Sequence, residues 1–207
     1  VNVTCNSTDA APLQVTAVKF RSVIVPTNKT ISSTVLAPLF RLRGLTSLNV
    51  ADNQLEGVIP GDGFLNLTRL VILNLSQNRL SGSLPSQLFH MSSLEKLFLF
   101  SNMLSGSLLQ GSNGIGNQSR LQTLSLYDNR FSGPIPDFIG NFKDLQTLIL
   151  YNNSFSSKIP SGIGNLAHLS SVKMNHNNLS GEIPNSLQNL STLTDLILNN
   201  NQLSGEI

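Results

Sequence analysis

The sequence has few of the residues from which catalytic and metal sites are usually built. Its 207 residues include three His, one Cys and no Trp, and only 12% of them are charged. It contains no CxxC or HExxH motif, which argues against a redox or zinc site. A net charge of +2 provides no strong field for nucleic acid or a membrane surface, and no apolar run reaches the ~18 residues needed to cross a membrane. We therefore expect no enzyme activity, no metal and no cofactor in this chain.

Leucine, asparagine and serine are unusually frequent, with 36, 24 and 28 copies. Hydrophobic residues make up 40% of the chain, which excludes a disordered polypeptide. Such a composition suggests internal repetition. Asparagine indeed recurs at spacings of 24 to 27 residues, at Asn53, Asn78, Asn102, Asn129, Asn153, Asn177 and Asn201.

The same apolar frame precedes each of these asparagines. Leu45, Leu48 and Val50 lead to Asn53, and the pattern LxxLxLxxN then recurs in every copy. The alternation within xLxL predicts a short strand whose alternate side chains point inward. One repeat cannot bury its own apolar face, so the repeats must stack, with their strands forming a parallel sheet. A degenerate eighth copy comes first and contains Val15, Val18 and Phe20.

A second motif follows the asparagines. It reads LEGVIP at 55–60, LSGSLP at 80–85, FSGPIP at 131–136, FSSKIP at 155–160 and LSGEIP at 179–184. Glycine permits a positive φ, and proline ends hydrogen bonding along a strand. Two copies depart from the pattern, because residues 104–109 read LSGSLL and Ser157 replaces the glycine. Three extra residues in the Gly-rich stretch 111–116 are interpreted as a loop on the convex side.

The combined pattern LxxLxLxxNxLxGxIP resembles the plant-specific leucine-rich repeats over residues 15–207. The resemblance implies an α/β solenoid of about eight repeats. It would have a curved parallel sheet on its concave face, a second short strand in each repeat, and 3-10 or short helical segments on its convex side. The repeated asparagines would form a structural ladder. Residues 1–14 resemble the remnant of an N-terminal cap, in which Cys5 would have its partner outside the chain, and we expect the chain to be a fragment of a longer ectodomain.

The residues between the inward positions predict an interaction surface. Those two or four positions before each ladder asparagine point out of the sheet, and neighbouring repeats bring them about 4.8 Å apart. Large and aromatic residues meet there in the central repeats, next to charged residues such as Glu95, Lys96, Asp128 and His176. The ligand-binding candidates on the concave face are Phe98, Phe100, Tyr127, Ile149, Tyr151 and Lys173. The alternative is that these rings only stack along the sheet.

Nine Asn-x-Ser/Thr sites favour a secreted compartment. Asn74 falls on the expected strand face, where a glycan would obstruct binding, so we expect it either to be unmodified or to lie where no ligand binds. The candidates for glycosylation are Asn2, Asn6, Asn28, Asn66, Asn117, Asn178 and Asn189.

The family resemblance implies an extracellular ligand-recognition module. It would belong to the ectodomain of a plant leucine-rich repeat receptor-like kinase or receptor-like protein, on the cell surface or in the apoplast. Its partners would be a peptide or protein ligand and a co-receptor ectodomain, without nucleic acid and without membrane contact by this segment, and a Ser/Thr kinase would lie outside the chain. A secreted inhibitor similar to the polygalacturonase-inhibiting proteins is the alternative, and a structural wall protein is a third reading. The sequence that follows Ile207 would discriminate between the receptor and the inhibitor.

Overall fold

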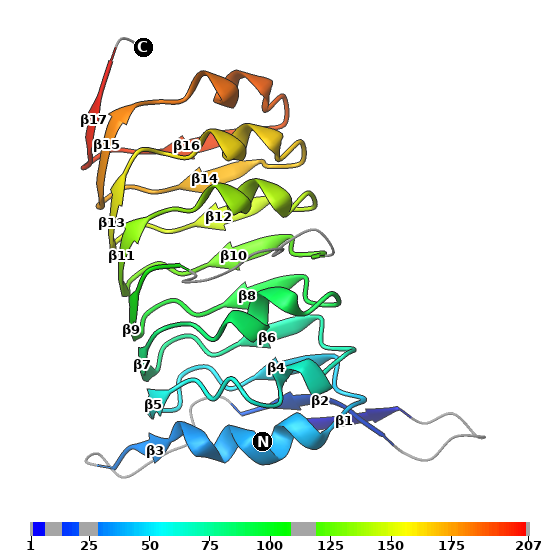
Figure 1. The fold of residues 1–207 in the computed structure, drawn as a ribbon. Helices are drawn as coiled ribbons and strands as arrows, with labels where there is room; N and C mark the ends of the chain where they lie inside the picture. The colour runs from blue at the N-terminus through cyan, green and yellow to red at the C-terminus, as the bar shows by residue number, and fades with distance from the viewer. Residues whose placement is uncertain (1, 7–13, 21–28, 109–118, 206–207) are drawn as a thin grey trace.

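The chain forms a solenoid in which two parallel sheets and a row of 3-10 helices surround one core (Figure 1). The computed structural model describes residues 2–6, 14–20, 29–108 and 119–205. Each full turn supplies one strand to each sheet, as the two motifs of the repeat predict. The α/β leucine-rich repeat architecture expected from the sequence is therefore confirmed.

The longer sheet has nine strands in the order β1-β2-β4-β6-β8-β10-β12-β14-β16. Its strands from β2 onward pair in parallel and in register, so that Leu124 lies opposite both Leu97 and Leu148. Their bounds are β1 Asn2–Asn6, β2 Gln14–Lys19, β4 Ser47–Asn49, β6 Ile72–Asn74, β8 Lys96–Phe98, β10 Thr123–Ser125, β12 Thr147–Ile149, β14 Ser171–Lys173 and β16 Asp195–Ile197.

The shorter sheet has eight strands, which come from the second motif of each repeat. They are β3 Ile31–Ser32, β5 Leu55–Val58, β7 Arg79–Gly82, β9 Met103–Gly106, β11 Arg130–Pro134, β13 Ser154–Ser157, β15 Asn178–Glu182 and β17 Gln202–Ser204. The 3-10 helices are η1 Ser33–Arg41, η2 Phe64–Asn66, η3 Ser86–His90, η4 Asp137–Asn141, η5 Ser161–Asn165 and η6 Asn185–Asn189. None of the described helices is long and apolar enough to cross a membrane. The Gly-rich insertion at 111–116 lies outside the described residues.

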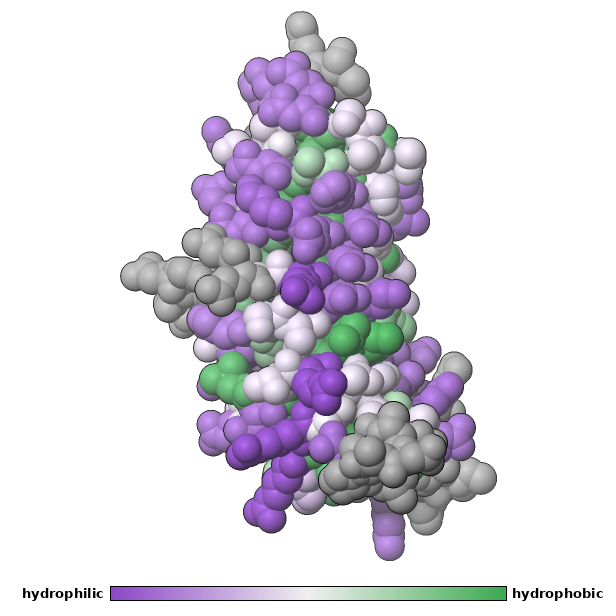
Figure 2. Space-filling model, turned by 90° about the vertical axis from the view of Figure 1, so that its right-hand side faces the viewer, coloured by the Kyte–Doolittle hydropathy of each residue, from purple (hydrophilic) through white to green (hydrophobic). Residues whose placement is uncertain are grey.

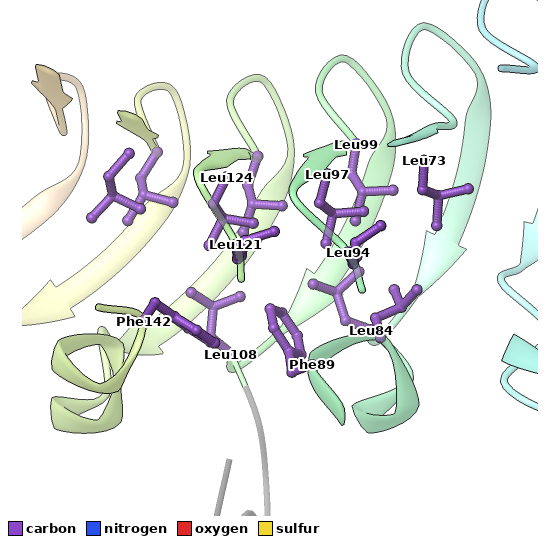
Figure 3. Packing of buried hydrophobic residues seen from close by; sticks show 14 of the residues in the cluster. Leu73, Leu84, Phe89, Leu94, Leu97, Leu99, Leu108, Leu121, Leu124 and Phe142 are labelled. Atoms are coloured by element: carbon purple, nitrogen blue, oxygen red, sulfur yellow. The ribbon is translucent and has the colours of Figure 1, made fainter. Parts of the chain in front are cut away.

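The leucines of the motif form one continuous core between the sheets and the helices (Figure 3). Leu97, Leu124 and Leu148 are fully or almost fully buried beneath the longer sheet. From the helical side, Phe89 and Phe142 approach each other with ring centroids 6.1 Å apart. Burial of these side chains is the main stabilising contribution, and because each repeat packs on its neighbours, the stability accumulates along the stack.

The repeated asparagines connect each repeat to the one before it. The Nδ2 of Asn78 donates to the carbonyl of Val50 in the preceding repeat and to those of Leu75 and Ser76 in its own, each at 3.0 Å. Its Oδ1 accepts from the amide of Leu55 at 2.9 Å. Asn102, Asn129, Asn153, Asn177 and Asn201 make the corresponding bonds. The hydrogen bonds predicted for a structural ladder are present.

The N-terminal segment departs from the regular stack. Strand β1 pairs with β2 in the antiparallel sense, whereas all later pairs are parallel. Cys5 lies in β1 with an exposed side chain. The first helix, η1, has nine residues with Pro38 inside it, which is long for a 3-10 helix. Ile31 and Ser32 of β3 lie in register with Leu55 and Glu56 of β5, and η1 begins directly after them at Ser33.

The flank at the right of Figure 1 faces the viewer in Figure 2. It is mostly hydrophilic, with small and separate apolar areas. The turns that lead from the 3-10 helices into the longer sheet lie on this flank (Figure 1). The larger apolar side chains predicted to bind a ligand belong instead to the repeats of the longer sheet, where Phe98 ends β8 and Ile149 ends β12.

Candidate functional site

Three aromatic rings form a stacked column on the outward side of the nine-stranded sheet, which we call the sheet face. The aromatic column consists of Phe100, Tyr127 and Tyr151, each two residues before a ladder asparagine. Ring centroids are 4.5 Å apart for Phe100–Tyr127 and for Tyr127–Tyr151, with interplanar angles of 6° and 13°. The spacing follows from the backbone, where Ser101 N–H donates to the Tyr127 carbonyl at 2.9 Å and fixes the register of adjacent repeats.

The stacking decides which parts of the rings a ligand can reach. Both ring faces of Tyr127 are covered by its two neighbours, so Tyr127 presents its ring edge and hydroxyl group, whereas the stack covers one face each of Phe100 and Tyr151. The pKa of Tyr127 is raised above 10.0, first by burial and then by the neighbouring Tyr151 and the charge of Asp128. The pKa of Tyr151 is raised by burial and then by the same carboxylate. Both hydroxyls are therefore neutral at physiological pH and can donate or accept hydrogen bonds.

Phe98 and Ile149 extend the apolar surface beside the column. Phe98 ends strand β8 and Ile149 ends strand β12, and both lie in register with Ser125 between them. Ser125 is only 2% exposed, because a small residue lies between two large ones. The five predicted apolar residues are each half-buried, because their side chains partly cover one another. We call the surface that they form the strip. The structure thus brings the five together, while their role in binding remains a prediction.

Polar residues limit this strip along the axis of the solenoid. Asn74 lies in register with Phe98 on one side, and Lys173 lies in register with Ile149 on the other. Lys173 Nζ is 3.0 Å from Asp195 Oδ2, which also accepts from Ser171 Oγ at 3.1 Å. The hydrogen bond from Lys173, followed by that from Ser171, holds the pKa of Asp195 below its ordinary value. Sequence analysis named Lys173 but missed Asp195, although aligning the repeats places the two on adjacent strands.

A polar row borders the aromatic column at the carboxyl ends of the strands. The residue just before each ladder asparagine has a positive φ, and in the central and C-terminal repeats these residues are Ser101, Asp128, Asn152, His176 and Asn200. Asp128 Oδ1 accepts from Asn152 Nδ2 at 2.7 Å, and Asp128 Oδ2 accepts from Ser101 Oγ at 3.3 Å. His176 Nε2 lies 2.9 Å from Asn200 Nδ2. Hydrogen bonds along this row hold side chains of adjacent repeats in place.

The glycosylation candidates fall away from the aromatic column wherever the structure describes them. Asn2, Asn66, Asn178 and Asn189 have exposed side chains, in β1, η2, β15 and η6 respectively. Asn74 is on the sheet face as expected, and its Oδ1 accepts from Ser76 N at 3.0 Å and from Ser76 Oγ at 2.6 Å. Asn6 ends β1, while Asn28 and Asn117 lie outside the described residues.

The candidate residues for chemistry stay apart. Among the described residues, no group of three or more His, Cys, Asp and Glu could hold a metal ion. His90 Nδ1 is 2.9 Å from the Ser86 carbonyl within η3, and His176 belongs to the polar row. The side chains that the fold does assemble are those of a surface for recognition.

Comparisons with known proteins identify the family. A model described as leucine rich repeat matches residues 41–104, and a second with the same description matches 120–142, 144–166 and 168–190. Together they account for more than half of the sequence. The chain belongs to the leucine-rich repeat family.

Structures similar to this leucine-rich repeat chain include ectodomains of plant receptor kinases. PEPR1–AtPEP1 has 34% identity and a TM-score of 0.81, covering 97% of this chain and 26% of that chain. The Arabidopsis thaliana receptor kinase GASSHO1/SCHENGEN3 in complex with CASPARIAN STRIP INTEGRITY FACTOR 2 has 40% identity and a TM-score of 0.70, covering 77% and 19%. Arabidopsis HAESA in complex with the peptide hormone IDA and the co-receptor SERK1 has 34% identity and a TM-score of 0.60, covering 82% and 32%. The chain thus spans between a fifth and a third of the length of these proteins.

Proposed function

We propose that the chain is a recognition module within the extracellular part of a plant leucine-rich repeat receptor-like kinase or receptor-like protein. It would bind a peptide or protein ligand on the sheet face, over the repeats that contain the aromatic column. The observation on which the proposal depends is the column itself, three stacked rings flanked by Phe98 and Ile149. The similar receptor structures that were solved with peptide hormones support this class of ligand.

The column suits recognition because it is rigid before a ligand arrives. The rings are held by stacking, and the backbone beneath them is held by hydrogen bonds between repeats. A preordered surface loses little conformational entropy on binding, so more of the contact energy appears as affinity. Tyrosine adds a hydroxyl to a large apolar body, which is why it is frequent among residues that dominate binding energy.

The partner proposal follows the same comparison. HAESA was solved with both a peptide and a co-receptor, so we expect a ligand bound to the sheet face to recruit a second ectodomain. The kinase that would receive the signal, and the segment that would anchor the receptor in the plasma membrane, lie outside this chain. The exposed Asn66, Asn178 and Asn189 are compatible with glycans on the other surfaces.

A binding experiment on the column tests the proposal. The probe is a set of short peptides enriched on the intact chain from a displayed library of random sequences. Replacing both Tyr127 and Tyr151 with Ala should weaken binding by at least about thirtyfold, since tyrosines at the centre of interfaces often contribute ~2 kcal/mol or more. Because the rings stack and are half-buried, the same change should also lower stability by about 1–3 kcal/mol.

Matched controls separate binding from folding. Asn175 and Asn199 occupy the same position in the next two repeats, so their double Ala variant should bind the peptides normally. Replacing both tyrosines with Phe should keep the stacking and the stability. Normal binding by the variant that lacks both tyrosine rings would refute the proposed site.

A further inference from the structure

A single carboxylate borders the aromatic column without a cation beside it. Within the part of the chain that the structure describes, no Lys, Arg or His nitrogen lies within 4.0 Å of Asp128, and the ion pair found on this face is Lys173–Asp195. The two donors to Asp128, Asn152 and Ser101, are neutral. The charge of Asp128 is therefore oriented but not neutralised, and it is close enough to raise the pKa of both column tyrosines.

The backbone does not require an acid at this position. Asp128 has a φ of 54°, and neutral residues adopt the same conformation elsewhere in the row, including Ser101 at 52° and Asn152 at 52°. An asparagine can still accept from Asn152 through its amide oxygen, and its amide nitrogen can donate to the Ser101 hydroxyl oxygen in place of the bond that Asp128 Oδ2 accepts. It also tolerates a positive φ as well as aspartate does. The backbone conformation of this row therefore leaves the negative charge of Asp128 unexplained, whereas a cationic ligand group would explain it.

Charged residues lie at both ends of the strands that cross the strip. Strand β8 begins with Lys96, whose side chain is exposed, and the chain then runs through Phe98 and Phe100 to the polar row. At the amino ends of the strands Lys96 follows the oppositely charged Glu95, whereas the negative charge of Asp128 at the carboxyl ends has no Lys, Arg or His nitrogen within 4.0 Å in the described part of the chain. A cationic group on a ligand is therefore attracted more strongly to the carboxyl side, which favours one orientation across the strands.

We propose that Asp128 binds a lysine or arginine side chain of the peptide ligand, with the aliphatic part of that side chain resting on the aromatic column. This inference rests on the proposed function of the sheet face. Because Tyr127 has both ring faces covered, the cation cannot lie over that face and would bind the carboxylate and the hydroxyl oxygens of the tyrosines instead. The methylene groups of lysine or arginine would contact the ring edges.

The test uses the intact chain and a displayed library of random dodecapeptides. Peptides selected on the wild-type protein should share a Lys or Arg at one position, and peptides selected on the Asp128→Asn variant should not. A selected peptide should bind that variant about tenfold more weakly, as expected for loss of a charge-assisted contact of ~1.4 kcal/mol. The affinity for the wild type should fall between about 0.15 M and 1 M ionic strength, while the affinity for the variant should change little.

A matched variant and a second measurement make the result decisive. Asp52→Asn changes the same position of an earlier repeat, where φ is 59°, and should leave binding unchanged. The melting temperature of Asp128→Asn should stay close to that of the wild type, because the asparagine keeps the bond from Asn152 and can donate to the Ser101 hydroxyl. Equal affinity and equal salt dependence for wild type and Asp128→Asn would overturn the inference.

The outcomes also separate this inference from the proposed function. Peptides that require Tyr127 and Tyr151 but contain no basic residue would refute the cation site and leave the proposed ligand face intact. Peptides that bind equally well without the two tyrosines would refute the proposed face, and the cation site with it. An affinity loss at Asp128→Asn that affects peptides with and without a basic residue alike would assign a structural role to Asp128.

Discussion

The two sheets of this solenoid share one core, yet their outward faces differ in how they vary along the chain. On the nine-stranded sheet, the residue four before the ladder asparagine changes in almost every repeat, through Asn74, Phe98, Ser125, Ile149 and Lys173. On the eight-stranded sheet, the residue three after the asparagine is almost constant. It is Ser81, Ser105, Ser132, Ser156, Ser180 and Ser204. We call the two faces the diverse face and the uniform face after these two positions, although the residue five after the asparagine also varies on the second sheet, as Val58, Pro134 and Glu182 show.

Packing restricts the glycine that follows this serine on the uniform face. In this sheet a glycine with positive φ lies beneath a side chain of the preceding repeat. A Cβ added to Gly82 would be 3.0 Å from Val58 Cγ1, and one added to Gly181 would be 3.0 Å from Lys158 Cγ. Both the backbone conformation and the neighbouring side chain therefore restrict the residue at this glycine position. The described strands of the nine-stranded sheet contain no glycine, so this restriction does not apply to their outward positions.

The largest effect should come from the core that both sheets share. Leu148 is fully buried in β12 between Leu124 and Val172 of the adjacent strands. Leu148→Ala should lower the free energy of unfolding by about 2–5 kcal/mol, because the lost methyl groups leave a cavity. Urea unfolding measures the change. Thr147, the preceding residue, points outward, and Thr147→Ala should cost less than ~0.5 kcal/mol. An equal loss for the two variants would contradict the inward and outward assignment of this strand.

An intermediate effect is expected on the uniform face. Gly181 has a φ of 74°, so Gly181→Ala should destabilise the protein by about 1–2 kcal/mol through left-handed backbone strain. Ser157 occupies the corresponding position of the preceding repeat with a φ of 70°. Ser157→Gly should relieve the strain and, after the entropy gained by the unfolded chain, raise stability by up to ~1 kcal/mol. Thermal unfolding of the two variants measures the expected decrease in stability for Gly181→Ala and the expected increase for Ser157→Gly. A loss of stability in Ser157→Gly would show that the serine side chain stabilises this turn.

The sequence predicts the repeat and the position of each side chain within it, but not the conformations of neighbouring side chains that contact each other. The leucine frame and the asparagine ladder depend only on position in the repeat, so periodicity was sufficient for them. The parallel orientation of the Phe100, Tyr127 and Tyr151 rings depends on side-chain rotamers, and the rotamer of each ring depends on those of its neighbours. The diagonal pair of Lys173 and Asp195 depends on side-chain reach between strands. The antiparallel β1 lies outside the repeat, so no periodic signal could have indicated it.

The smallest effect should come from the ion pair on the diverse face. The pKa of Asp195 is lowered from its ordinary value of 3.8, so the charged carboxylate is favoured in the folded state. Its contribution to stability is complete above that ordinary value and is lost as the pH falls through the lower pKa of the folded state. Both side chains are over a third exposed, so solvent and salt should keep the contribution small.

The pH dependence of melting can isolate this pair. The difference in melting temperature between the wild type and Asp195→Asn should shrink as the pH is lowered below 3.8, and added salt should reduce it at neutral pH. A difference that persists in acid would mean that Asp195 acts through the hydrogen bond from Ser171 and not through its charge.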